Sequence, residues 1–266
     1  MNKTKPNGMH LLRGLLPLTT ICVYVFLYVP ILILILFSLN KSDVPFTWQG
    51  FSFIWYRQLW QSPEVWHALT NSLIVAASAA FLSISIALLY VFYGQQAKVD
   101  RYYILFLISL ATPEIVIAVG LLMLFSFFYI PLGLTTLIAG HTLIGLGYSI
   151  PIIQARYQEL DRQYMEASFD LGASPGQTLR YVMIPLLRPA LLACLLLVLV
   201  LSLDDFIISF LCSGGSTQTL PIYIFVMIRS GASPMVNALS TIMLILSSIL
   251  VLLFSSLRIK KMDLLR

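Results

Sequence analysis

Residues 197–212 read LVLVLSLDDFIISFLC, the end of an apolar run that begins near residue 189. The run is long enough to cross a bilayer as a helix, which takes about 20 apolar residues. Hydrophobic residues make up 59% of the 266-residue chain and charged residues only 10%, whereas soluble domains carry about 25% charged residues. These features predict an all-α membrane protein with several spans.

Hydropathy predicts six transmembrane helices in a single domain that covers residues 1–266. Their approximate ranges are 15–39, 69–94, 102–129, 136–155, 189–212 and 236–257. The first apolar run exceeds the about 7–15 residues of a signal-peptide core, and no A-x-A cleavage site follows it. It is therefore predicted to remain as an uncleaved first span.

Two of the segments between the spans have an unusual composition. Segment 40–68 is rich in aromatic residues and nearly neutral, which is typical of an amphipathic segment at the membrane interface. Segment 213–235 has glycine and proline at both ends of a short apolar piece. That pattern predicts a re-entrant or interfacial half-helix.

The basic residues are distributed unevenly among the loops. Thirteen of the 16 lysine and arginine residues fall in the N-terminal tail, in segments 95–101 and 156–188, and in the C-terminal tail. Because Lys and Arg are enriched on the cytoplasmic side, both termini and the 156–188 loop are predicted to be cytoplasmic. This topology accounts for the net charge of +5, so no nucleic-acid partner is inferred.

The cytoplasmic loop is too structured for a plain connector. Residues 163–189 read QYMEASFDLGASPGQTLRYVMIPLLRP, with charged and apolar residues interleaved at helical spacing. The GASPG stretch at 172–176 is a strong turn signal, and Pro175 suits the first turn of a second helix. The pattern predicts a helix to about Leu171, a turn, and a second helix that leads into the fifth span.

This loop resembles the EAA motif of ATP-binding-cassette importer permeases, written EAA, three residues, G, nine residues, I-x-L-P. Glu166-Ala167-Ser168, Gly172 and Val182-Met183-Ile184-Pro185 stand at that spacing. Ser168 replaces the second alanine, and Val182 and Ile184 replace isoleucine and leucine, all small or volume-similar changes. Over essentially its whole length the chain is similar to PotC-type permease subunits of spermidine/putrescine importers.

The resemblance implies a type I permease fold in the bacterial inner membrane, with residues 163–185 docked as a coupling helix in a cleft of an ATPase subunit. The coupling residues would be Glu166, Ala167, Ser168, Phe169, Leu171 and Gly172. It further implies a heterodimer with a homologous second permease, two copies of the ATPase subunit and an external, periplasmic substrate-binding protein.

The chain itself is expected to be non-catalytic. It contains no GxxxxGK[ST] phosphate-binding sequence, so ATP and Mg²⁺ are expected on the partner ATPase and no cofactor is expected here. The spacing of Cys22, Cys194 and Cys212 fits neither a disulfide framework nor a zinc site, so no metal site is predicted.

Three acidic residues, Glu114, Asp204 and Asp205, lie inside predicted spans. A charge at mid-membrane costs about 2.5–3.5 kcal/mol on insertion scales, so such residues are functional-site candidates by default. A passing di- or tricationic amine would relieve the repulsion between close carboxylates. The three acids are therefore predicted to line a substrate pathway.

Helical spacing adds detail to this prediction. In a continuous fifth span, Ser202, Asp205 and Ser209 share one polar face, so Asp205 is expected to face the pathway and Asp204 its rim or a helix seam. The alternative is that the aspartates cap a short helix at 206–212. Glu114 follows Pro113, whose break would expose carbonyl groups suited to an ammonium; the alternative is a carboxyl group at a helix seam.

Two further features are weaker. His141, Gly145 and Tyr148 share a face of the fourth span and are interpreted as helix packing, the usual role of small and polar residues in membranes. Trp48 is a candidate for receiving cargo at the external mouth, although an interfacial aromatic belt also explains it.

The leading hypothesis is the permease subunit of an ATP-driven polyamine importer, in which Asp205→Asn abolishes uptake and leaves assembly intact. The alternative is the same fold with another cargo, iron or an anion such as phosphonate or sulfate. Anionic cargo would favour arginine in the pathway, where Arg229 is the one candidate. A membrane-embedded enzyme or channel is disfavoured, because no HExxH-type pair occurs and adjacent aspartates on one helix point about 100° apart.

Overall fold

The computed structural model describes residues 8–44, 47–96, 103–215, 217–231 and 234–263. These residues are mainly helical, with one isolated β-bridge between Asn40 and Phe51. They belong to two compact units: Met1–Gln61 with Met227–Leu244, and Ser62–Val226 with Ile245–Arg266. The predicted cytoplasmic charges Lys3, Lys5, Lys98 and Arg101 lie outside the described residues.

The first unit contains α1 (Gly8–Ser38), α2 (Ile54–Gln61) and the beginning of α12 (Pro234–Asp263). Asn40 organises the loop between α1 and α2. Its amide nitrogen donates to the Thr47 carbonyl at 2.6 Å, and its own carbonyl accepts from the Trp55 indole at 2.7 Å. The predicted interfacial segment is therefore a hydrogen-bonded loop followed by a short helix.

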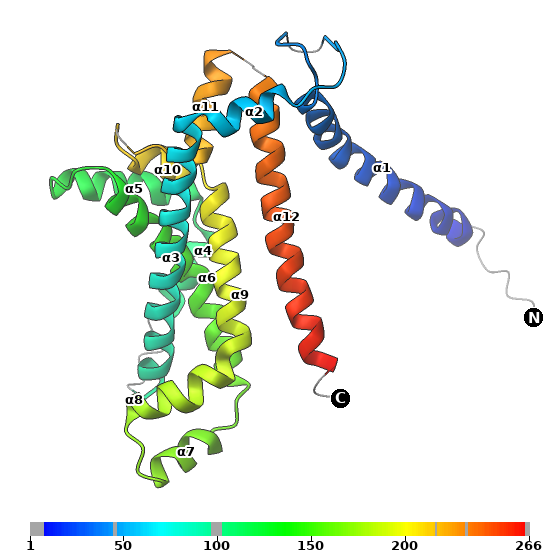
Figure 1. The fold of residues 1–266 in the computed structure, drawn as a ribbon. Coiled ribbons are helices and arrows are strands. Elements are labelled where there is room, and N and C mark those ends of the chain that lie inside the picture. Colours follow the sequence, from blue (N-terminus) through cyan, green and yellow to red (C-terminus); the bar gives the residue numbers. More distant parts are fainter. Residues whose placement is uncertain (1–7, 45–46, 97–102, 216, 232–233, 264–266) are drawn as a thin grey trace, which may run out of the picture. The chain divides into compact units, whose positions relative to one another are not determined.

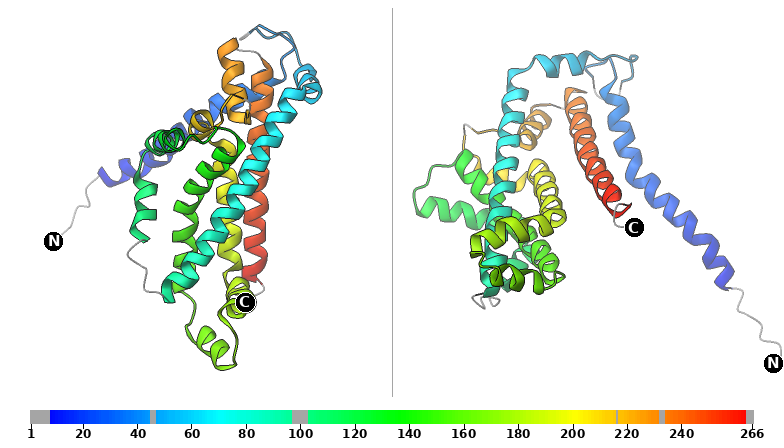
Figure 2. Two further views of the ribbon diagram at one scale, coloured as in Figure 1. Left: turned by 90° about the vertical axis from the view of Figure 1, so that its left-hand side faces the viewer. Right: turned by 60° about the horizontal axis from the view of Figure 1, so that its bottom comes forward.

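Three long helices form the core of the second unit: α3 (Pro63–Gln96), α6 (Leu134–Gln158) and α9 (Ile184–Asp204). They run side by side in every view (Figures 1 and 2). Small residues permit the close approach. A side-chain carbon at Gly145 of α6 would meet Ser83 Oγ at 2.8 Å and Val198 Cγ1 at 3.0 Å, so α3 and α9 both press against that glycine.

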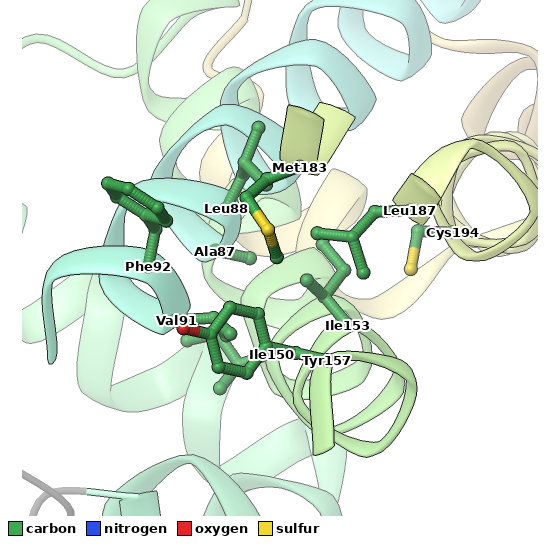
Figure 3. Packing of buried hydrophobic residues seen from close by; sticks show 10 residues of the cluster. All are labelled: Ala87, Leu88, Val91, Phe92, Ile150, Ile153, Tyr157, Met183, Leu187 and Cys194. Atoms are coloured by element: carbon green, nitrogen blue, oxygen red, sulfur yellow. The ribbon is translucent and has the colours of Figure 1, made fainter. Parts of the chain in front are cut away.

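An apolar cluster fills the end of this bundle that adjoins the 163–185 loop (Figure 3). α3 contributes Ala87, Leu88, Val91 and Phe92, α6 contributes Ile150, Ile153 and Tyr157, and the chain from Met183 onward contributes Met183, Leu187 and Cys194. Burial of such side chains contributes about 25 cal/mol per Å² of apolar surface. The cluster thus joins the loop firmly to the three helices.

The third predicted span, 102–129, is not one straight helix. It consists of α4 (Tyr103–Ala111) and α5 (Glu114–Phe127), which meet at an angle of 115° (Figure 2). The break falls at Thr112 and Pro113. Proline lacks the backbone N–H needed to continue a helix, and its ring disfavours the helical conformation of the residue before it.

The fifth predicted span, 189–212, has different ends. A continuous apolar helical stretch runs from Pro175 to Asp204; it comprises α8 (Pro175–Thr178), a π-helical turn at Leu179–Met183 and α9. The chain is extended at Asp205 (φ −71°, ψ 121°) and a separate short helix, α10 (Ile207–Cys212), follows. The prediction of one helix to residue 212 is therefore wrong, since the helix ends between the two aspartates.

Within the described residues, five helices are long and apolar enough to span a membrane, and the bent pair α4–α5 makes a sixth span if it counts as one. The loop helix α7 (Gln163–Asp170) precedes α8. The predicted half-helix is α11 (Leu220–Ser230), and its first backbone N–H donates to Ser72 Oγ on α3 at 2.8 Å.

Candidate functional site: an acid-lined cavity

A cavity of about 230 Å³ opens in the second unit where the helix breaks meet α6. Its walls come from the end of α4, the start of α5, the middle of α6 and the last turns of α9. The polar side chains that line it are Ser109, Thr112, Glu114, His141, Tyr148, Ser202, Asp204 and Asp205. All three acids of the predicted spans are therefore brought together.

The two helix breaks explain how the acids come to meet. Glu114 occupies the first turn of α5, directly after the Pro113 break. Asp205 precedes α10, directly after the end of α9. Helix N-termini leave backbone N–H groups without intrahelical partners and favour negative charge nearby, so each carboxyl group lies where the backbone stabilises it.

Asp205 has most of its side chain buried, with 6% exposed. Its carboxylate accepts from the backbone N–H of Ser209 at 3.0 Å and, more weakly, from that of Ile208 at 3.4 Å. It therefore caps α10, which was the alternative considered for the aspartates. Asp204, the last residue of α9, is exposed and lines the cavity. From the sequence, Asp205 is expected to face the pathway and Asp204 to lie at its rim or at a helix seam, whereas in the structure Asp204 is the more exposed of the two.

His141 lies beside Asp205, on α6. Its Nε2 atom is 3.4 Å from Asp205 Oδ2 and 3.3 Å from Ser209 Oγ, and its Nδ1 atom is 2.8 Å from Ser202 Oγ. Only 3% of the imidazole side chain is exposed. The sequence-based interpretation of His141 as a helix-packing residue does not include these polar contacts. An ionisable side chain within an apolar span is itself an indication of polar partners.

Glu114 is half-buried, and its carboxyl group lines the same cavity as that of Asp205. Two carboxylates that share a cavity repel each other unless a proton or a cation lies between them. No lysine or arginine belongs to the described residues that line the cavity. The described lining therefore combines three acidic side chains with one basic side chain, that of His141.

The remaining predicted pathway residues are placed differently. Ser202 lines the cavity, whereas Ser209 is buried behind it against His141. Trp48 belongs to the first unit, where its ring packs edge-on against Phe51, with centroids 4.9 Å apart. Its role in a pathway stays a prediction. Among the residues that the structure describes, no group of three His, Cys, Asp or Glu side chains could hold a metal ion.

The EAA-like loop forms a second candidate site. Ser168 Oγ of α7 hydrogen-bonds to Thr178 Oγ1 of α8 at 2.9 Å, and Tyr157 Oη of α6 donates to Met165 Sδ at 3.1 Å. Gly172 has φ +82°, a left-handed conformation that ends α7 and favours glycine. Residue Leu171 is 88% exposed. The loop is anchored to the bundle yet leaves an apolar surface uncovered.

The exposed surface of this loop contains most of the predicted coupling residues. Glu166, Ala167, Phe169, Leu171 and Gly172 are exposed, and Ser168 is partly buried by its bond to α8. An exposed leucine beside an exposed aromatic ring is typical of a protein interface. In Figure 1 and in the left view of Figure 2 this loop lies at the opposite end of the second unit from α10.

Comparison with known proteins assigns the family. Residues 79–260 match the family described as binding-protein-dependent transport system inner membrane component. The chain belongs to this family. The match covers the acid-lined cavity and the EAA-like loop together, so both candidate sites lie within the part of the inner membrane component that family members share.

Curated relatives fall in the same family. The chain is 39% identical over 238 residues to the spermidine/putrescine transport system permease protein PotC of Haemophilus influenzae. This alignment covers 87% of this chain and 91% of that protein. It is 37% identical over 235 residues to PotC of Escherichia coli K12, with 86% and 88% covered. The putrescine permease PotI of Escherichia coli K12 is 32% identical over 231 residues, with 83% and 82% covered.

A solved structure confirms the type I importer permease fold. A chain of a bacterial ABC transporter that imports the acidic polysaccharide alginate superposes with a TM-score of 0.71, covering 97% of this chain and 99% of that one. The two sequences are only 14% identical, so the match concerns the fold alone. This inner membrane component is thus a multi-pass, all-α permease subunit of a transport system.

Proposed function

We propose that this inner membrane component is a permease subunit of an ATP-driven importer of polyamines such as spermidine and putrescine, and forms half of the pathway. The observation that carries the proposal is the gathering of Glu114, Asp204 and Asp205 in one cavity whose described lining contains no lysine or arginine. The names of the relatives, which are spermidine/putrescine and putrescine permeases, support the same cargo.

The charge of the cavity argues against the alternative cargoes. Anions such as sulfate or phosphonate would be repelled by three carboxyl groups. An iron ion would need three or more ligating side chains, and the described residues offer no such group. A polyamine carries separate ammonium groups along a flexible chain, and each can approach one carboxylate. The geometry therefore favours an organic polycation.

The EAA-like loop is the proposed contact with the ATPase. α7 would enter a cleft of that subunit, with Leu171 and Phe169 as apolar contacts and Glu166 as a polar one. The helical stretch from Pro175 to Asp204 has 30 residues and bends between α8 and α9 (Figure 1). Because one end joins the loop and the other ends at the cavity, a rigid-body shift of α7 would be passed along this stretch to Asp204.

The remaining parts of the transporter follow from this assignment. The complex would contain a homologous second permease, two copies of the ATPase subunit that bind ATP and Mg²⁺, and a periplasmic substrate-binding protein. This chain contributes no catalytic residue. Its termini and the 163–185 loop would face the cytoplasm, since most lysine and arginine residues lie there.

The direct test is uptake of radiolabelled putrescine and spermidine by proteoliposomes that contain the complete complex. ATP-dependent uptake that unlabelled polyamines suppress, and that sulfate, phosphonate and ferric iron leave unchanged, is the expected result. If one of those ions suppressed the uptake of the labelled polyamine, that ion would be the cargo instead. Conduction by this permease without the ATPase would instead indicate a channel.

A further inference from the structure

The His141 side chain joins three helices in the interior of the second unit. The imidazole comes from α6, Ser202 from the last turn of α9, and Ser209 from α10. Asp205, which separates α9 from α10, lies 3.4 Å from the same Nε2 atom. One buried ring therefore contacts polar groups on both sides of the helix break that creates the cavity.

The donors and acceptors around the ring fit one another. A carboxylate only accepts hydrogen bonds, so a proton on Nε2 faces Asp205 and Ser209 Oγ. The Nδ1 atom then accepts from the Ser202 hydroxyl at 2.8 Å. The neutral Nε2–H form of the ring therefore fits its surroundings: Nδ1 accepts from Ser202, and the Nε2 proton lies on the side of Ser209 Oγ and Asp205.

These contacts stabilise polar groups at the break. Residues 197–212 are otherwise apolar, and such a sequence readily forms one continuous membrane helix, as hydropathy alone predicts for this chain. If the helix continued through Asp205, Ile208 would lie one turn after Asp204 on the same helix face and crowd its side chain. Continuing the helix would also remove the backbone N–H groups of Ile208 and Ser209 from the Asp205 carboxylate.

We propose that His141 is a positioning residue of the transport pathway: it holds the break between α9 and α10 open and thereby keeps Asp204 exposed in the cavity. Asp205 is the intermediate, because His141 contacts it from α6 while it caps α10. The inference rests on the proposed function only for its transport consequence. The geometric part concerns the exposure of Asp204 and is independent of the cargo.

The geometric part is tested by cysteine labelling in the assembled complex. Asp204→Cys is introduced in a chain with Cys22→Ser, since Cys22 is exposed whereas Cys194 and Cys212 are fully buried. The probe is a membrane-impermeant cationic methanethiosulfonate, and its reaction rate reports access to position 204. His141→Asn should lower that rate about tenfold, the factor that corresponds to about 1.4 kcal/mol.

Two matched variants separate the contacts of the ring. A glutamine amide at position 141 can reach the place of Nε2 and donate to Asp205, whereas an asparagine amide reaches only the place of Nδ1. His141→Gln should therefore keep more of the labelling rate than His141→Asn. Thr142→Val is the control, because Thr142 is a buried neighbour on α6 whose hydroxyl donates to the Ile138 carbonyl of its own helix.

The transport consequence is measured with Asp204 intact. His141→Asn should raise the half-saturating putrescine concentration by about tenfold and leave the amount of assembled complex unchanged, with His141→Gln in between. Labelling and uptake in both variants equal to those of Thr142→Val would overturn the proposal. Loss of assembly in both variants would overturn it too, in favour of a purely structural role. If the Asp204→Cys chains label as expected while the wild-type complex takes up no polyamine, the proposed function is refuted and the positioning role stands.

Discussion

Asp204 and Asp205 are consecutive residues with opposite surroundings: the Asp205 carboxylate accepts the Ser209 backbone N–H at 3.0 Å, whereas Asp204 is exposed to the cavity. The end of α9 between them produces this difference. The two acids therefore differ in their contacts. Asp205 stabilises the start of α10 and adds its charge to the cavity, whereas Asp204 offers its charge directly to the cargo.

Substitution of Asp205 separates its charge from its capping role. Asn at this position keeps an oxygen that can cap α10, whereas Ala removes it; loss of a cap costs about 0.5–2 kcal/mol. Asp205→Asn should assemble normally and lose uptake, and Asp205→Ala should in addition lower the thermal unfolding temperature of the complex. Equal stability of the two variants would contradict the capping role, and full uptake by Asp205→Asn would contradict a need for the charge.

Glu114 is the acid contributed by α5. Glu114→Gln removes a carboxyl group beside Asp205 that can pair with an ammonium group and keeps the shape of the side chain, so the half-saturating putrescine concentration should rise about tenfold. Initial uptake rates over a range of putrescine concentrations measure this shift. Glu159→Gln is the matched control, since Glu159 forms an exposed pair with Arg156. Equal shifts in the two variants would remove Glu114 from the pathway.

Leu171 tests the proposed contact with the ATPase. Its side chain is exposed in this chain, so Leu171→Ala should leave the stability of the permease unchanged. Burial of a leucine contributes about 1.5–3 kcal/mol, and binding of the ATPase subunit should weaken by about 30-fold. Co-purification and titration of the ATPase measure the change.

Leu192→Ala provides the comparison for that experiment, because Leu192 is an exposed leucine on α9, within the membrane span. It should bind the ATPase as the wild type does. ATPase binding that is equally strong with Leu171→Ala would place the contact elsewhere on the chain.

Gly145 tests the packing of the three long helices. Gly145→Ala introduces a carbon within 3.0 Å of Ser83 and Val198, and overpacking of this kind costs about 1–3 kcal/mol. The complex should unfold at a lower temperature. Gly120→Ala, where no atom lies within 4 Å of the added carbon, should be neutral or slightly stabilising, so an equal loss in both variants would contradict the packing.

The sequence predicts the membrane class, the positions of most spans and the helix–turn–helix loop, because each depends on local composition or spacing. Pro175 begins the second loop helix as expected, and the first ends at Asp170. The ends of the third and fifth spans could not be found by hydropathy, since apolar residues continue across both breaks. Pro113 carried a local signal for one break, and Asp205 acting as a cap carried the signal for the other.

The sequence identifies the charged residues of the candidate site, but it does not predict how they are arranged in space. Glu114, Asp204 and Asp205 stand out as acids in apolar runs, and the structure brings them into one cavity. The contact of His141 with Asp205 joins residues 64 positions apart in the sequence, and helix-face arguments treat one helix at a time. Such a contact depends on how α6 packs against the end of α9, which the spacing within either helix does not encode.

Binding of a polycation by the acids of the cavity is measured by ATP-dependent putrescine uptake in proteoliposomes with the complete complex, in which wild type is compared with Asp204→Asn. The variant should show normal assembly and basal ATPase activity, together with a half-saturating putrescine concentration raised about tenfold or more. Uptake by Asp204→Asn with unchanged affinity and maximal rate would contradict such binding.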